Sequence, residues 1–253
     1  MERKVDNLLV ETYETREQMG RAAAKDVRDT IAKLLENQEE VNVVFAAAPS
    51  QKDLYQGLLE QDIPWYRINA LHMDEYFGLT EDNAQSFRNY LKKNLFEKVA
   101  FKNIHYIQGE NEDVDAECIR YSELLRTFKP DVVCMGIGEN THIAFNDPPV
   151  ADFNDSKLVK KVELDEVCRQ QQVNDGCFPT IGDVPTHALT LTIPALVSAS
   201  HIFCVVPNIT KAQAVYHTLN EKISEKYPST ILRRHPHAKL YLDKDSSSLL
   251  YST

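Results

Sequence analysis

The sequence predicts an α/β protein in which helices cover both faces of a mostly parallel sheet, a three-layer α/β/α sandwich. The first observation is that short apolar runs alternate with helical patterns, which is typical of parallel sheets. The second is that several runs are apolar almost throughout, as expected for strands covered on both faces. The third is that no Pro- or Gly-rich linker interrupts the pattern, so we expect residues 1–253 to form a single domain.

The first half of the chain has helical patterns between strand-like runs. Thr15 and Gln18 form a capping-box pair before a helix with one apolar face. Ser50 and Asp53 are expected to cap a second helix, and apolar residues around Phe87 mark a third. The expected strands of this half are residues 7–12, 41–46, 67–73 and 104–107.

The second half continues the alternation but contains one weak stretch. A helical pattern over residues 114–128 leads into a buried strand at 131–135. Residues 150–185 are charged, glutamine-rich and turn-like, so we expect a long connection that covers the site. The remaining expected elements are strands at 186–193 and 201–206, a helix at 210–219 and a strand at 238–242.

Composition and charge exclude several classes of function. The chain is 43% hydrophobic with a net charge of −10, and no basic stripe is available to replace the counterions of a nucleic acid. The sequence shows neither a membrane-spanning apolar run nor a signal peptide. The five cysteines are scattered without a C-x-x-C pair, which favours a reducing cytoplasm. We therefore expect a cytoplasmic protein with a small-molecule partner, and a homo-oligomer is left open.

The stretch from Cys134 to Pro149 is the strongest candidate for a site. Gly136 and Gly138 end the preceding strand and allow the backbone to approach a small ligand. In doubly wound sheets, ligands bind just beyond the carboxyl ends of strands, where this loop is expected to lie. The polar residues that crowd into the loop are Glu139, Asn140, His142, Asn146 and Asp147.

Two side chains in these segments have the chemistry of acid–base catalysts. Asp74 directly follows a strand, and an enclosed carboxylate there could act as a general base, although a surface acid or a helix cap would look the same. His142 lies between Asn140 and Asp147, which could hold its imidazole in one tautomer.

An anion site is expected where a strand leads into a helix. Lys211 stands at such a helix start, where free backbone N–H groups and the helix dipole favour a phosphate. The loop from Ala46 to Ser50 has a similar position but is a weaker signal, since Pro49 has no N–H to donate. His235-Pro-His237 has no acidic or cysteine partner at a ligand spacing, so we expect no metal site there.

Four separated motifs, in the same order, resemble those of the glucosamine-6-phosphate deaminase (isomerase) family. The likeness covers nearly the whole chain. The motifs are Leu71-His-Met-Asp-Glu-Tyr-Phe-Gly-Leu79, Gly136-Ile-Gly-Glu-Asn-Thr-His-Ile-Ala-Phe-Asn-Asp-Pro148, Thr186-His-Ala-Leu-Thr-Leu191 and the helix start at Lys211.

The resemblance implies a three-layer α/β/α fold with a Rossmann-like sheet. It also implies conversion of glucosamine-6-phosphate and water to fructose-6-phosphate and ammonia, with no metal or organic cofactor. It implies that Asp74 moves a proton from C2 to C1, and that His142, held by Asn140 and Asp147, opens the sugar ring. The phosphate would be bound by Lys211. The other implied substrate-binding positions are Ala48, Ser50, Gly138 and, as a candidate for a phosphate-binding arginine, Arg169.

The chain departs from the family pattern at positions that keep two alternatives open. A Gly-Gly-Thr-Pro phosphate loop is replaced by Ala48-Pro-Ser-Gln51, and Asp-Gly-His is replaced by Asn140-Thr-His142. These changes suit a non-catalytic sugar-phosphate sensor. The second alternative is a 6-phosphogluconolactonase-type hydrolase, whose family has a similar Gly-x-Gly-x-x-x-His loop. Its chemistry needs no base that removes a proton from carbon, the role implied for Asp74.

Overall fold

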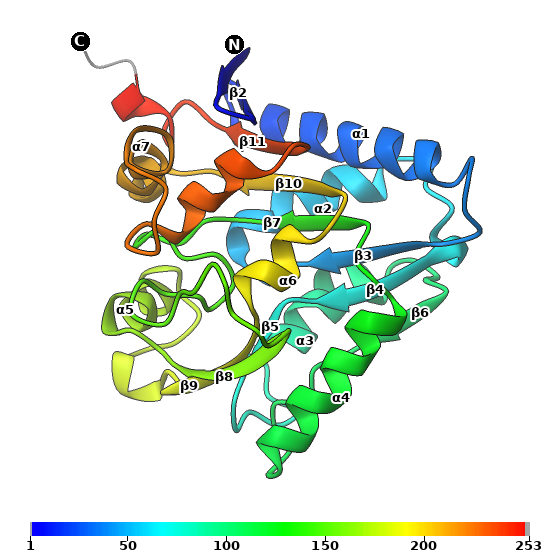
Figure 1. Ribbon diagram of the computed structural model, residues 1–253, viewed down its shortest axis with the longest axis vertical. Coiled ribbons are helices and arrows are strands. Elements are labelled where there is room, and N and C mark those ends of the chain that lie inside the picture. Colours follow the sequence, from blue (N-terminus) through cyan, green and yellow to red (C-terminus); the bar gives the residue numbers. More distant parts are fainter. Residues whose placement is uncertain (1, 251–253) are drawn as a thin grey trace.

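The central sheet has eight strands in the order β1-β2-β11-β10-β7-β3-β4-β6 in the computed structural model, which describes residues 2–250 (Figure 1). Every neighbouring pair is parallel except the β1–β2 hairpin at one edge. The strands are β1 (Glu2–Val5), β2 (Leu8–Thr12), β3 (Val41–Phe45), β4 (Ile68–His72), β6 (Asn103–His105), β7 (Val132–Met135), β10 (His201–Val206) and β11 (Ala238–Leu242). The expected mostly parallel sheet is confirmed.

The direction in which strands are added reverses between β3 and β7. From β3 the chain adds β4 and β6 on one side, returns to place β7 against the other side of β3, and continues outward to β10 and β11. Loops that leave two such neighbouring strands diverge, and the crevice between them is where open α/β sheets bind ligands.

Helices cover both faces of this sheet. One face packs against α1 (Arg16–Leu34), α2 (Lys52–Leu59) and α3 (Phe87–Leu91), and the other against α4 (Val114–Thr127), α6 (Ile193–Val197) and α7 (Ala212–Asn220). Successive strand residues alternate between the two hydrophobic clusters, so that Val43 and Phe45 face the first layer while Val44 faces the second. This confirms the three-layer sandwich. No helix within residues 2–250 has both the length and the apolar character needed to cross a bilayer.

A second, three-stranded antiparallel sheet was not expected from the sequence. It consists of β5 (Asp74–Tyr76), β9 (His187–Leu191) and β8 (Val159–Glu163), and Figure 1 shows it below the central sheet beside α5 (Glu166–Asn174). The expectation that residues 150–185 form only a connection is therefore wrong. The strand in this segment was missed because three of its five residues are charged, which an edge strand of a small sheet tolerates. The helix was missed because α5 is mostly polar.

One of the two expected helix caps is present in the structure, and the other is absent. Thr15 caps α1, because its Oγ1 accepts a hydrogen bond of 3.2 Å from the backbone N–H of Gln18. The Ser50 and Asp53 cap is wrong, since a 3₁₀ turn precedes α2 and no side chain caps that helix. Asp53 instead pairs with Arg16 at 2.7 Å.

Short helical turns complete the described chain. They are 3₁₀ turns at Pro49–Gln51, Trp65–Arg67, Ile181–Asp183, Ile209–Lys211, Pro228–Arg234 and Ser248–Leu250, and a π-helical turn at Lys92–Phe96 that continues α3.

Candidate active site

A cleft opens at the carboxyl ends of β3, β4, β7 and β10, at the point where the strand order reverses. The loops after these strands supply most of its wall, and α1, α3 and α5 supply the rest. Six of the site residues expected from the sequence line it: Ala48, Ser50, Asp74, Gly138, His142 and Lys211. The sequence therefore predicted the correct edge of the sheet for the cleft.

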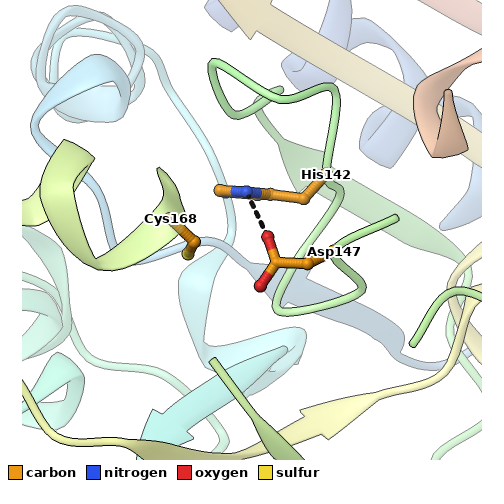
Figure 2. Close-up of side chains that lie close together, drawn as sticks. All are labelled: His142, Asp147 and Cys168. Atoms are coloured by element: carbon orange, nitrogen blue, oxygen red, sulfur yellow. Dashed lines mark ion pairs between the residues drawn. The ribbon is translucent and has the colours of Figure 1, made fainter. Parts of the chain in front are cut away.

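His142 is held at the cleft wall by two neighbours in its own loop. Its Nδ1 lies 2.9 Å from Oδ1 of the fully buried Asp147 (Figure 2). The amide of Asn140 links the two, because its Nδ2 donates to the same carboxylate oxygen at 3.0 Å and its Oδ1 accepts from the backbone N–H of His142 at 3.1 Å. The three side chains are therefore brought together as expected.

The environment of Asp147 keeps this carboxylate ionised. Burial by itself raises its pKa, but the charge of His142 and the hydrogen bond from Asn140 outweigh burial, and the pKa lies below its usual value. The backbone N–H of Asp165 also points to Oδ2, at 3.4 Å. A fixed negative charge beside Nδ1 favours a proton on that nitrogen, which leaves Nε2 to exchange protons with a ligand.

Gly138 is needed because the imidazole of His142 lies against its Cα. A Cβ atom at position 138 would lie 2.1 Å from Cε1 and 2.2 Å from Nε2 of that ring. The loop is closed by backbone hydrogen bonds from Gly138 N to His142 O at 2.9 Å and from Thr141 N to Gly138 O at 3.0 Å. Thr141 adopts a φ of 71°, which is strained for a β-branched residue.

Asp74 places a carboxylate in the cleft at the start of β5. Within residues 2–250 we find no hydrogen bond or ion pair to its side-chain oxygens, although the residue is only 7% exposed. Burial, reinforced by the neighbouring Glu75, raises its pKa well above the usual value. A carboxylate with a raised pKa is a stronger base, so Asp74 has the properties that proton abstraction requires.

Two buried neighbours position Asp74 without facing the cleft. His72 Nδ1 lies 2.9 Å from the backbone carbonyl of Asp74, and its Nε2 accepts from the backbone N–H of Ile107 at 2.8 Å. Glu75 points the opposite way and accepts from the backbone N–H groups of Phe87 and Arg88, each at 2.9 Å. Burial raises the pKa of Glu75 to about 7, against these hydrogen bonds.

Lys211 provides a buried cation in the wall of the cleft. It ends the 3₁₀ turn before α7 and is only 5% exposed, yet no residue among 2–250 forms an ion pair with its ammonium group. Burial lowers its pKa, while Asp175 and Glu139 act in the opposite direction. An unpaired charge in such a position is stabilised by an anionic ligand, so this part of the cleft suits an anionic group.

Comparison with known protein families identifies the relatives of this chain. Residues 14–242 match the family model described as glucosamine-6-phosphate isomerases/6-phosphogluconolactonase. The chain belongs to this family.

Individual family members match over most of their length. The chain is 32% identical to a glucosamine-6-phosphate deaminase of Listeria monocytogenes serotype 4a (strain HCC23), over 90% of this chain and 96% of that protein. It is 31% identical to one from Bacillus cereus (strain B4264), over 96% of this chain and 88% of that protein.

Solved structures show the same fold. A monomeric glucosamine-6-phosphate deaminase superposes with a TM-score of 0.87 and 28% identity, covering 95% of this chain and 99% of that one. A 6-phosphogluconolactonase from Thermotoga maritima gives a TM-score of 0.76 and 21% identity, covering 94% of this chain and 100% of that one, which shows the fold alone.

Arg169 does not take the position expected of a phosphate-binding arginine of this family. Its Nη2 donates to the backbone carbonyls of Ile181 at 2.7 Å and Val184 at 3.0 Å, and the residue lines a separate hollow. In this structure the guanidinium group of Arg169 fastens α5 to the segment before β9 and does not line the cleft.

Several residues that line the cleft were not predicted from the sequence. Arg16, Gln171, Gln172 and Asp175 line the cleft, and the Oε1 of Gln171 accepts a hydrogen bond of 2.8 Å from the backbone N–H of Glu139. Gln171 and Gln172 lie on α5 and Asp175 is its C-cap, and the sequence did not reveal this helix. No local signal marks Arg16, which reaches the cleft only because α1 packs against α2.

Proposed function

We propose that this protein deaminates and isomerises an amino-sugar phosphate, converting glucosamine-6-phosphate and water to fructose-6-phosphate and ammonia. The observation that carries the proposal is the free carboxylate of Asp74, with its raised pKa, in the same cleft as the oriented His142. Family membership and the deaminases at about 32% identity support the same reaction class.

The phosphate group is proposed to bind at the Lys211 end of the cleft. The ammonium group supplies the charge, and Ser50 and Ala48 line the same cleft. A hydrogen bond between charged groups contributes about 1.5–3 kcal/mol, so Lys211 is the main determinant of phosphate affinity in this proposal.

Ring opening is assigned to His142. Its Nε2 takes the proton from the anomeric hydroxyl and returns a proton to the ring oxygen, which breaks the C1–O5 bond and forms the aldehyde. Asp147 stabilises the transient imidazolium, and Asn140 keeps both groups in place through its two hydrogen bonds.

Isomerisation is assigned to Asp74. Its carboxylate removes the proton from C2 to form an enolamine and then delivers a proton to C1, which leaves an imine at C2. Water adds to that carbon, and ammonia leaves as the ketone forms. These steps use only side chains and water, so we expect turnover without an added metal or organic cofactor.

The deciding experiment measures ammonia release from glucosamine-6-phosphate by the purified full-length protein. Asp74→Asn and His142→Ala are each expected to lower turnover by at least about 100-fold, in line with acid–base contributions. Near wild-type rates in either variant would contradict the role of that residue.

Failure of the wild-type protein to release ammonia would favour one of the alternatives. Hydrolysis of 6-phosphogluconolactone that persists in Asp74→Asn would identify a lactonase. Tight binding of the amino-sugar phosphate without any turnover would identify a sensor.

A further inference from the structure

A third side chain meets the His142–Asp147 pair from a distant part of the chain. Cys168, on α5, directs its sulfur toward the carboxylate of Asp147 (Figure 2). One nitrogen, one oxygen and one sulfur atom of these three side chains lie within 4.8 Å of one another, and all three residues are buried. The proposed reaction uses the nitrogen and the oxygen but gives the thiol no role.

We propose that His142, Asp147 and Cys168 form a binding site for Zn²⁺, and that the bound ion inhibits the enzyme. The binding part of this proposal stands independently of the reaction, whereas the inhibition rests on the proposed function of His142.

The donor set favours Zn²⁺ over harder cations. Imidazole, carboxylate and thiolate are the three protein ligands that Zn²⁺ takes in tetrahedral sites, while Mg²⁺ and Ca²⁺ prefer oxygen ligands alone. The sites closest in type have three protein ligands and leave the fourth position open.

The distances require only small movements. Zinc bonds of about 2.0–2.1 Å to nitrogen and oxygen place those two atoms about 3.3 Å apart at a tetrahedral angle, and Nδ1 and Oδ1 are already 2.9 Å apart. A Zn–S bond of about 2.3 Å requires the sulfur to lie about 3.6 Å from each of them, within reach of a donor set that spans no more than 4.8 Å.

Nδ1 of His142 forms no hydrogen bond within residues 2–250. It is buried, and its 2.9 Å approach to Oδ1 of Asp147 lacks the direction of a hydrogen bond. Coordination requires the ring to turn Nδ1 toward an ion between the oxygen and the sulfur.

Binding the ion exchanges protons for metal–ligand bonds. Coordination forms Zn–N and Zn–S bonds: the thiol proton of Cys168 passes to solvent, and the proton on Nδ1 of His142 is released while Nε2 becomes protonated. His142 lines the cleft, so the ion would be held by a residue of the cleft wall. Because the ion takes the nitrogen and oxygen that orient the imidazole, it prevents ring opening and competes with the sugar phosphate.

The test uses Co²⁺ as a spectroscopic probe that does not depend on activity. The purified full-length protein, freed of metal, is titrated with Co²⁺ while the thiolate-to-cobalt charge-transfer band in the near ultraviolet is recorded. We expect the band at a stoichiometry of one ion per chain, its loss on addition of Zn²⁺, and its absence in Cys168→Ser and Cys168→Ala. Cys177→Ser is the matched control, because this half-buried cysteine lies outside the cluster.

The inhibition is measured separately as the ratio of turnover with and without Zn²⁺. The Zn²⁺ concentration for half inhibition is expected to rise at least 10-fold in Cys168→Ser but not in Cys177→Ser, and added sugar phosphate is expected to weaken Co²⁺ binding. A wild-type protein without the band, or a folded Cys168→Ser that retains it, would overturn the site. Inhibition that is unchanged in Cys168→Ser would overturn the inhibitory role.

Discussion

Replacing Gly138 with alanine tests whether the position of the His142 ring controls the reaction. The new Cβ atom would lie 2.1, 2.2 and 2.3 Å from Cε1, Nε2 and Nδ1 of the ring, where ordinary contacts begin at 3.4 Å. The imidazole must therefore retreat by more than about 1 Å, a displacement that costs on the order of 100-fold in rate. This corresponds to about 2.7 kcal/mol of lost transition-state stabilisation.

The assay compares steady-state ammonia release by Gly138→Ala with that by Gly182→Ala. Gly182 is a matched control because an added Cβ there meets nothing closer than 3.6 Å. We expect kcat to fall about 100-fold in Gly138→Ala, with little change in Tm, because the displaced ring can move into the cleft. A Gly138→Ala protein within about 3-fold of the Gly182→Ala control would refute this account of His142.

Four further substitutions test other parts of the structure. Lys211→Met is expected to raise KM for the sugar phosphate by about 10- to 100-fold through loss of a charged hydrogen bond, and an unchanged KM would place the phosphate elsewhere. Arg169→Ala is expected to change KM by less than about 3-fold, because its guanidinium group binds backbone carbonyls outside the cleft. Thr141→Gly is expected to leave the free energy of unfolding unchanged or to raise it by up to about 1 kcal/mol, because relief of the strained positive φ offsets the loss of the side chain. A clearly lower free energy of unfolding in urea denaturation would contradict this expectation. Burial lowers the pKa of His72 from 6.5 to about 3, so between these pH values the unfolded chain binds a proton that the folded protein excludes. The free energy of unfolding should therefore fall as pH decreases from about 6.5 toward 3, by up to ~1.4 kcal/mol per pH unit. Urea denaturation at several pH values should show a weaker dependence in His72→Gln, and an identical slope would contradict the neutral, buried histidine.

The architecture of the central sheet could be predicted from the sequence because its causes are local and repeated. A strand covered by helices on both faces must be apolar almost throughout, as in Val41–Phe45, and the helices between strands carry one apolar face. The position of the cleft could be predicted for a similar reason, since the loops that follow parallel strands, which carry Asp74 and His142, gather at one edge of the sheet.

The rest of the fold and of the candidate site depends on contacts between residues that are distant in the sequence. A short edge strand such as Val159–Glu163 and a polar helix such as α5 have little signal of their own, since they are stabilised by the segments they pack against. Because α5 determines which side chains reach the cleft, the sequence could not show that Arg169 turns away from it. Nor could it show that Cys168 meets His142 and Asp147, since a donor cluster depends on distances that folding alone establishes.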